Sequence, residues 1–178
     1  MKHRMVRAAG TALLFIFIIS GPLFGDAAAR TAAGTLLRID RDRGFLVSAD
    51  GGGSWRERNE GLPRHVVYPF TESNPEPLTS IGVDPARQSR VAVTTSSRIF
   101  MSEDLGNSWR EVPVDKPIEG SAFFTSVALS PASRDRILLG TSFNGVYETR
   151  DSGDSWTHLE ELSSPLYRGA GFYEEIRS

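Results

Sequence analysis

Cysteine is missing from the 178-residue chain. The protein can therefore form no disulfide, even in an oxidising compartment, and it has no thiol to carry a thioether-linked lipid. Its stability must come from core packing and from hydrogen bonds between strands. The part of the chain that follows residue 29 is about 149 residues long, which is enough for one ordinary core.

Clustered positive charge is missing as well. Beyond residue 29 the chain has 17 basic and 21 acidic side chains, a net charge of −4, and the two signs are interspersed. A nucleic-acid partner needs clustered Lys and Arg to neutralise phosphates, and an anionic membrane surface needs a polybasic segment. The sequence predicts neither partner, so membrane contact is expected only through an uncleaved leader.

Long apolar runs are scarce, and the one present lies at the N-terminus. Three basic side chains precede the apolar residues 12–24, and Ala27-Ala28-Ala29 offers a small-residue cleavage site. This pattern predicts a signal peptide over residues 1–29 and a mature region, residues 30–178, that is periplasmic or secreted. The run is shorter than a typical transmembrane helix of about 20 residues; an uncleaved N-terminal anchor is the alternative.

Three segments of the chain share the pattern Ser/Thr-x-Asp-x-Gly-x-Ser-Trp, and together they use every tryptophan of the sequence. In each segment we expect Gly at positive φ in a tight turn, and Asp accepting hydrogen bonds from its own turn. Trp should then cover the turn with an apolar face, which makes the motif a structural device. Its landmark residues are Ser48, Asp50, Gly52 and Trp55; Ser102, Asp104, Gly106 and Trp109; and Thr149, Asp151, Gly153 and Trp156.

The repeat extends beyond these turns. Residues 79–109 and 125–156 align in register with a single one-residue gap, and each copy divides into four short strands rich in Val, Ile, Leu and Thr. Four strands in roughly 47 residues is the size of a propeller blade. The register also predicts equal burial for Thr95 and Thr141.

Blade boundaries follow from this alignment. We expect blades over residues 34–60, 77–114 and 123–161, and the start of a further blade over 172–178. The first blade is expected to be partial, because no first strand is evident before residue 35.

These segments and their spacing resemble the bacterial neuraminidase repeat, or BNR/Asp-box, family, which includes sialidases, sortilin-type ectodomains and photosystem II assembly-factor-like propellers. The resemblance covers nearly all of residues 35–160. It implies an all-β fold, a partial β-propeller of about three four-stranded antiparallel blades after an N-terminal signal helix. In that family the Asp-box lies at the blade periphery and is not catalytic.

A sialidase-like glycosidase is the sharpest enzyme hypothesis, since such sites use arginines and a Tyr nucleophile. The chain has no Phe/Tyr-Arg-Ile-Pro segment near its start and too few blades to surround a central site. Beyond residue 29 it has only His65 and His158, without the spacing of metal ligands. Asp40 and Asp42 fit a solvated turn better than a calcium loop. The sequence therefore predicts no catalytic residue, no metal and no cofactor.

Residues 59–78 form the longest connection between blades, and they hold His65, Tyr68 and Phe70 among prolines. This segment is either a binding loop or a stiff connector whose aromatic side chains cover the open end of the first blade. The residue types are compatible with both, and the incomplete first blade favours the connector.

The sequence thus predicts an exported, non-enzymatic binding or scaffold module with a protein or carbohydrate partner. The alternatives are the N-terminal accessory part of a larger secreted enzyme, such as a glycoside hydrolase, and a gene fragment. An array of about three blades leaves apolar faces at its two ends, so we expect it to self-associate or to continue into further sequence.

Overall fold

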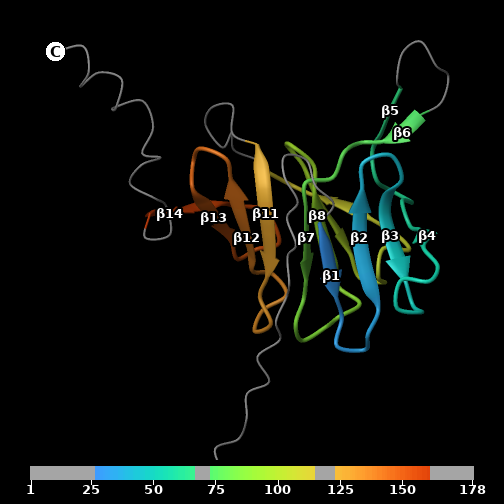
Figure 1. Ribbon diagram of the computed structural model, residues 1–178. Coiled ribbons are helices and arrows are strands. Elements are labelled where there is room, and N and C mark those ends of the chain that lie inside the picture. The colour runs from blue at the N-terminus through green and yellow to red at the C-terminus, as the bar shows by residue number, and fades with distance from the viewer. Residues whose placement is uncertain (1–26, 67–72, 115–122, 161–178) are drawn as a thin grey trace, which may run out of the picture.

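The computed structural model describes residues 27–66, 73–114 and 123–160, and these residues are built almost entirely of antiparallel strands and turns (Figure 1). The predicted signal helix falls almost wholly in residues 1–26, outside the described part. Among the described residues, none belongs to a helix long and apolar enough to cross a bilayer.

Three sheets contain four antiparallel strands each, and every sheet is one continuous stretch of chain. The first sheet consists of β1 (Ala28–Arg30), β2 (Leu36–Asp40), β3 (Gly44–Ser48) and β4 (Arg56–Glu57). The second consists of β7 (Ser80–Val83), β8 (Val91–Thr94), β9 (Ile99–Ser102) and β10 (Arg110–Val112). The third consists of β11 (Phe124–Leu129), β12 (Ile137–Thr141), β13 (Val146–Thr149) and β14 (Thr157–Leu159).

The first sheet is complete, so the prediction of a partial first blade is wrong. Its first strand, β1, pairs with β2 through Ala28 opposite Arg38 and Ala29 opposite Leu37. Ala29 is buried, and the predicted cleavage after this residue falls inside the strand. Strand β1 was not predicted from the sequence because Ala and Arg have little intrinsic preference for strands. Its conformation depends on its pairing with β2.

The connection between the first two sheets also carries structure that the sequence did not predict. β5 (Arg64–Val66) and β6 (Ser73–Pro75) form a two-stranded antiparallel hairpin, which projects from one end of the molecule in Figure 1. The pairing places His65 opposite Asn74. Part of the predicted connector is therefore a hairpin.

The predicted register between the second and third sheets is confirmed. Ile81 pairs with Val93 in the second sheet, and Val127 pairs with Leu139 at the equivalent place in the third. The one-residue gap lies in the turn that follows. There the N–H of Thr95 donates to the carbonyl of residue 98, whereas the N–H of Thr141 donates to that of residue 145.

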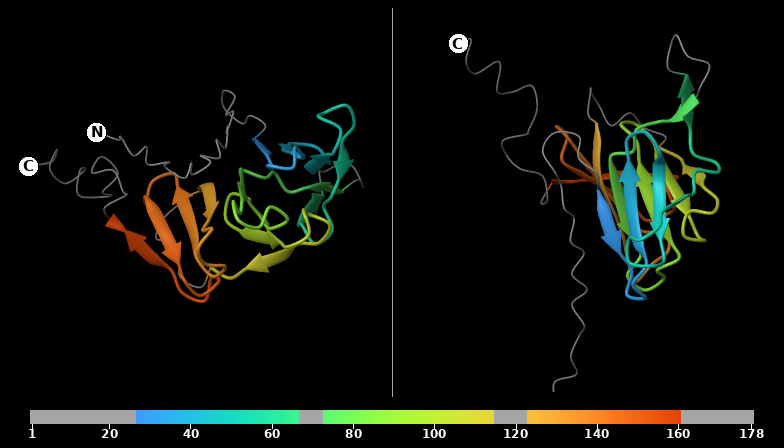
Figure 2. Two further views of the ribbon diagram at one scale, coloured as in Figure 1. Left: turned by 90° about the horizontal axis from the view of Figure 1, so that it is seen from below. Right: turned by 45° about the vertical axis from the view of Figure 1, so that its right-hand side comes forward.

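The three sheets are stacked like the leaves of a fan, as the end-on view in Figure 2 shows. Strand β7 contacts β1 and β2 of the first sheet and β11 of the third. We call the face of a sheet that is turned toward the preceding sheet its near face, and the opposite face its far face. One core layer lies between each pair of neighbouring sheets. The first layer includes Leu37, Phe45, Val47, Val91, Val93 and Trp109, and the second includes Ala92, Ile99, Met101, Val127, Leu139 and Trp156.

Burial differs between the sheets because only the second has a neighbour on both faces within the described residues. Val91 on its near face and Ala92 on its far face are both fully buried. Leu138, the third-sheet equivalent of Ala92, is half-buried. The prediction of equal burial for Thr95 and Thr141 is wrong for this reason, since Thr95 is fully buried and Thr141 is half-buried.

Candidate functional site

The three Asp turns have one hydrogen-bond pattern. In the second turn, Asp104 Oδ1 accepts from the Ser108 N–H at 2.9 Å and Asp104 Oδ2 accepts from the Ser108 hydroxyl at 2.7 Å. Ser102 Oγ donates to Asp104 Oδ1 and accepts from the Gly106 N–H at 2.7 Å. The same four bonds recur in the first and third turns. The Asp carboxylate and the Ser or Thr hydroxyl that precedes it are thus satisfied inside each turn.

These bonds favour the ionised carboxylates. The Ser155 hydroxyl, the Thr149 hydroxyl and the Ser155 N–H together lower the pKa of Asp151 from 3.8 to about 2. Bonds from the Ser54 hydroxyl and N–H hold the pKa of Asp50 well below its usual range. For Asp104, burial raises the pKa, but the bonds from Ser108 outweigh it and the net shift is downward. A carboxylate held in this way is a poor general acid or base near neutral pH.

The glycine of each turn has the predicted positive φ, which is 84° at Gly106. In the second turn the glycine is also needed for space, because a Cβ there would lie 2.5 Å from Phe45 of the first sheet. In the first turn, a Cβ on Gly52 would meet only Leu36 and Trp55 of its own sheet, at ordinary contact distances.

Tryptophan fastens the second and the third turn to the preceding sheet. Trp109 Nε1 donates to the carbonyl of Arg58 at 2.9 Å, and Trp156 Nε1 donates to that of Pro113 at 3.1 Å. The Trp109 ring also packs edge-on against Phe45, with the centroids 5.0 Å apart. Trp55 has no such acceptor among the described residues.

A buried charge network links the second and third sheets. The Arg90 side chain is 2% exposed and donates from Nε to Glu103 at 3.1 Å. Its Nη1 lies 3.5 Å from Asp84, which is fully buried, and its Nη2 donates to the carbonyl of Arg134. Because the Arg90 side chain is buried and each of its nitrogen atoms already has a partner, the network joins the two sheets and is not exposed to a ligand.

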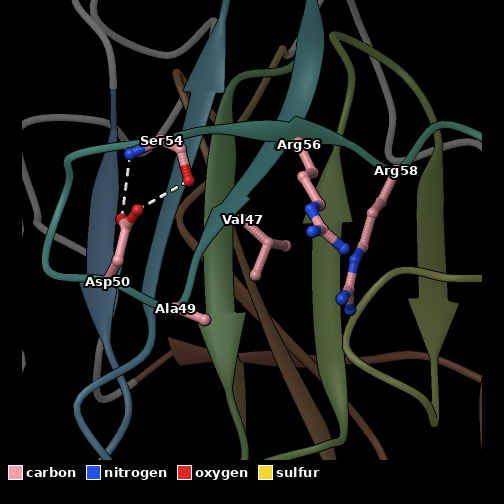
Figure 3. Close-up of a pocket in the computed structure, with 6 residues that line it drawn as sticks. All are labelled: Val47, Ala49, Asp50, Ser54, Arg56 and Arg58. Atoms are coloured by element: carbon pink, nitrogen blue, oxygen red, sulfur yellow. Dashed lines mark hydrogen bonds between the residues drawn. The ribbon is translucent and has the colours of Figure 1, made fainter.

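One cleft of about 300 Å³ lies on the far face of the first sheet, beside its Asp turn (Figure 3). Arg58 Nη1 donates to the carbonyl of Leu105 in the second sheet at 2.9 Å, so this guanidinium is anchored. Arg56 is exposed and has no hydrogen bond or ion pair among the described residues. Figure 3 shows both arginine side chains extending in the same direction from the strand. The lining residues are Val47, Ala49, Asp50, Ser54, Arg56 and Arg58.

Asp50 adds one negative charge to this cleft, but its oxygen atoms are already occupied. Its carboxylate accepts bonds from the hydroxyls of Ser48 and Ser54 and from the Ser54 N–H. The unsatisfied polar group of the cleft is therefore the Arg56 guanidinium, which is a donor for anionic oxygen atoms.

The predicted site residues do not converge. The twelve landmark residues lie in three separate turns, one to a sheet. His65 is exposed on β5, whereas Tyr68 and Phe70 lie outside the described residues. In the described ranges, no group of three or more His, Cys, Asp or Glu side chains is placed to hold a metal ion.

Sequence reasoning missed Arg56 and Arg58. Residues two apart in a strand share a face, so their spacing after Trp55 was a usable signal. The second sheet has Arg110 at the position of Arg56 and Val112 at that of Arg58. The pair is thus specific to the first sheet.

No family model matches the chain. It is 27% identical over 125 residues to the photosystem II assembly lipoprotein Ycf48 of Synechococcus sp. (strain CC9902), covering 66% of this chain and 33% of the relative. It is 28% identical over 106 residues to vacuolar protein sorting/targeting protein 10 of Zygosaccharomyces rouxii, covering 59% of this chain and 6% of the relative. The matches thus span a third or less of these curated relatives.

Solved structures show the same fold. YCF48 from Cyanidioschyzon merolae superposes with a TM-score of 0.55 at 15% identity, over 77% of this chain and 40% of that one. YCF48 bound to D1 peptide gives 0.51 at 16% identity, over 79% and 46%. The GH74 enzyme of Niastella koreensis gives 0.50 at 22% identity, over 73% and 16%. The fold is that of a partial β-propeller, and these similarities are consistent with the BNR/Asp-box family that the sequence resembles.

Proposed function

We propose that the chain is an exported, non-enzymatic binding or scaffold module of the β-propeller type, and that its partner is a protein. Support comes from two relatives whose names state such roles: a photosystem II assembly lipoprotein, and a YCF48 structure with a bound D1 peptide. The lipoprotein name and the apolar run at the N-terminus of this chain favour a location outside the cytoplasm.

The observation that carries the proposal is the free guanidinium of Arg56 in the cleft of the first sheet. Arg58 lies beside it, so the local charge is positive, while Val47 and Ala49 supply an apolar floor. A planar guanidinium pairs with a carboxylate through two parallel hydrogen bonds. A cleft of about 300 Å³ is at the small end of ligand sites. The group it suits best is a carboxylate at the end of a short peptide segment.

The Asp turns have a structural role in this proposal. Each Asp carboxylate accepts hydrogen bonds from its own turn. The tryptophans of the second and third turns donate hydrogen bonds to the preceding sheet. These residues hold the sheets in place, so the cleft keeps its shape before a ligand arrives. A pre-formed site limits the entropy lost on binding.

Peptide binding to the purified chain tests the proposal. The probe is a pool of fluorescent hexapeptides with a free C-terminal carboxylate, and the same pool with an amidated C-terminus is the comparison. We expect binding of the free-acid pool, measured by anisotropy, and a loss of about tenfold in affinity for Arg56→Gln, because one charge-assisted contact disappears.

Arg110→Gln is the matched control, since Arg110 occupies the same position in the second sheet and is also exposed. It should bind the free-acid pool as the unaltered chain does. Equal binding of the free-acid and amidated pools, or equal losses in the two variants, would contradict a carboxylate site at Arg56.

A further inference from the structure

The cleft of the first sheet carries opposite charges at its two ends. Figure 3 shows Asp50 at one end, Arg56 and Arg58 at the other, and Val47 between them. The strand register gives the same order. Val47 pairs with Arg56, and the Arg58 N–H donates to the Phe45 carbonyl, further along the strands from the Asp turn. A ligand that fills the cleft therefore meets a negative group at one end and positive groups at the other.

These charges are not neutralised by one another or by their neighbours. Asp50 and Arg56 are both exposed, and neither forms an ion pair within the part of the chain that the structure describes. Glu57 follows Arg56 in β4, so its side chain lies on the opposite face of the strand, where it pairs with Arg43 at 2.8 Å. The partner of Arg58 is a neutral main-chain carbonyl. Both ends of the cleft thus keep their charge.

Asp50 is a fixed anion at neutral pH. Hydrogen bonds from the hydroxyl and N–H of Ser54 and from the Ser48 hydroxyl favour its carboxylate, and they hold the pKa of Asp50 well below its usual range. Because its oxygen atoms already accept these bonds, Asp50 attracts a cation in the cleft through its charge and needs no new hydrogen bond to do so.

The surface between the two ends is apolar, and this is specific to the first sheet. Val47 and Ala49 are two positions apart, share one face of the chain and line the cleft. In each of the other sheets the equivalent pair includes a charged residue. The pairs are Met101 and Glu103 in the second sheet, and Glu148 and Arg150 in the third. Only the first sheet thus combines an apolar floor with an acid at one end and two arginines at the other.

A lysine at the C-terminus of a peptide has three groups in the order that this cleft presents. Its α-carboxylate suits the Arg56 guanidinium. Its four-carbon stem suits an apolar surface, on which lysine side chains commonly lie while the charged head stays in water. Its ammonium is a compact positive charge, which suits the end that holds Asp50. A C-terminal acidic residue would instead bring a second negative charge toward Asp50, and the two would repel.

We propose that the cleft selects peptides that end in lysine, with the α-carboxylate on Arg56, the side-chain stem over Val47 and Ala49, and the ammonium facing Asp50. This inference rests on the proposed function, because it names the residue that enters the same cleft. Asp50 then has two roles: its hydrogen bonds build the turn, and its charge determines which C-terminal residue is preferred.

Fluorescence anisotropy with three free-acid hexapeptides tests this on the full chain. The peptides share their first five residues and end in lysine, norleucine or glutamate; norleucine keeps the apolar stem and lacks the charge. We expect the lysine peptide to bind about fivefold more tightly than the norleucine peptide, as for an exposed pair of opposite charges, and the glutamate peptide to bind more weakly than either. The lysine preference should disappear at about 1 M salt, where the Debye length is about 3 Å.

Two variants separate the contributions of the two ends. Asp50→Asn removes the charge and keeps a carbonyl oxygen for the turn, so the lysine and norleucine peptides should bind it equally. Arg56→Gln should weaken the binding of all three peptides and leave the lysine preference in place. Asp104→Asn makes the same change in the second turn, outside the cleft, and should keep the preference. Urea unfolding of each variant shows that it is folded, and the comparison of peptides on the unaltered chain does not depend on any variant.

Failure of this inference is distinct from failure of the carboxylate site. If amidated peptides bind as tightly as free acids, both are wrong. If free acids are preferred but the lysine and norleucine peptides bind the unaltered chain equally, only the lysine selection is overturned. A lysine preference that survives in folded Asp50→Asn would overturn it as well, because the selecting charge would then lie elsewhere.

Discussion

Trp109 and Arg58 are 51 positions apart in sequence, yet the indole Nε1 of the first donates a 2.9 Å hydrogen bond to the main-chain carbonyl of the second. The Trp109 side chain is 7% exposed and its ring lies against Phe45. One side chain thus joins the Asp turn of the second sheet to the outer end of the first. The turn itself is local, and the tryptophan supplies its long-range contact.

Removing that side chain should separate the first two sheets. We expect Trp109→Ala to lower the free energy of unfolding by about 3–5 kcal/mol, as for other buried aromatic residues. Trp109→Phe keeps most of the apolar contact but leaves the Arg58 carbonyl unpaired, at a cost of about 1–3 kcal/mol. Urea unfolding measures both. Trp55→Phe is the control and should cost less, because Trp55 makes no such bond; equal costs at the two positions would contradict the fastening role.

The glycines of the first two turns should differ in their tolerance of alanine. Both have positive φ, so Gly52→Ala should cost about 1–2 kcal/mol of stability for backbone conformation alone. Gly106→Ala adds a clash with Phe45, for a further cost of about 1–3 kcal/mol. Chemical unfolding at a concentration where the chain is monomeric compares the two. If Gly106→Ala were no worse than Gly52→Ala, the two sheets would have to be less closely packed than described.

Acid should weaken the turns over a defined range. The pKa of Asp151 is about 2 in the folded chain and 3.8 without its partners. Because the folded value is the lower one, the stabilisation is complete above the unfolded pKa and is lost as the pH falls from about 4 through about 2. The melting temperature of Asp151→Asn should therefore fall less steeply in this range than that of the unaltered chain. Asp154→Asn, an exposed substitution in the same turn, should retain the full dependence.

The position of β1 bears on where the signal peptide would be cleaved. Cleavage after Ala29 would remove Ala28 and Ala29, and with them two of the three residue pairs between β1 and β2. We expect the exported chain to begin at Ala28 or earlier, where Gly25-Asp26-Ala27 offers small residues at the positions that a signal peptidase reads. Mass spectrometry of the intact exported protein gives its first residue. A mature chain that starts at Arg30 and melts at the same temperature as a chain that starts at Ala27 would show β1 to be dispensable.

Sequence alone predicted the repeat and its register, because alternating apolar residues and turn landmarks are local signals. It missed β1 and the β5–β6 hairpin, whose residues have weak strand preferences and depend on their pairing partners. The prediction of equal burial for Thr95 and Thr141 was wrong because the burial of a residue depends on whether another sheet covers its own sheet. The Arg56 cleft was missed because it forms only once β3, the Asp turn and the strand after it have folded together.

Each four-stranded sheet is a single uninterrupted stretch of chain, and this has a consequence for folding during synthesis. A polypeptide that emerges N-terminus first from a narrow channel can complete one sheet before the next has appeared. The long loops that slow the folding of many β-proteins are thereby avoided. The tryptophan of each later turn can then pack on a preceding sheet that has already folded. The sheets can therefore fold one after another, in their order along the chain.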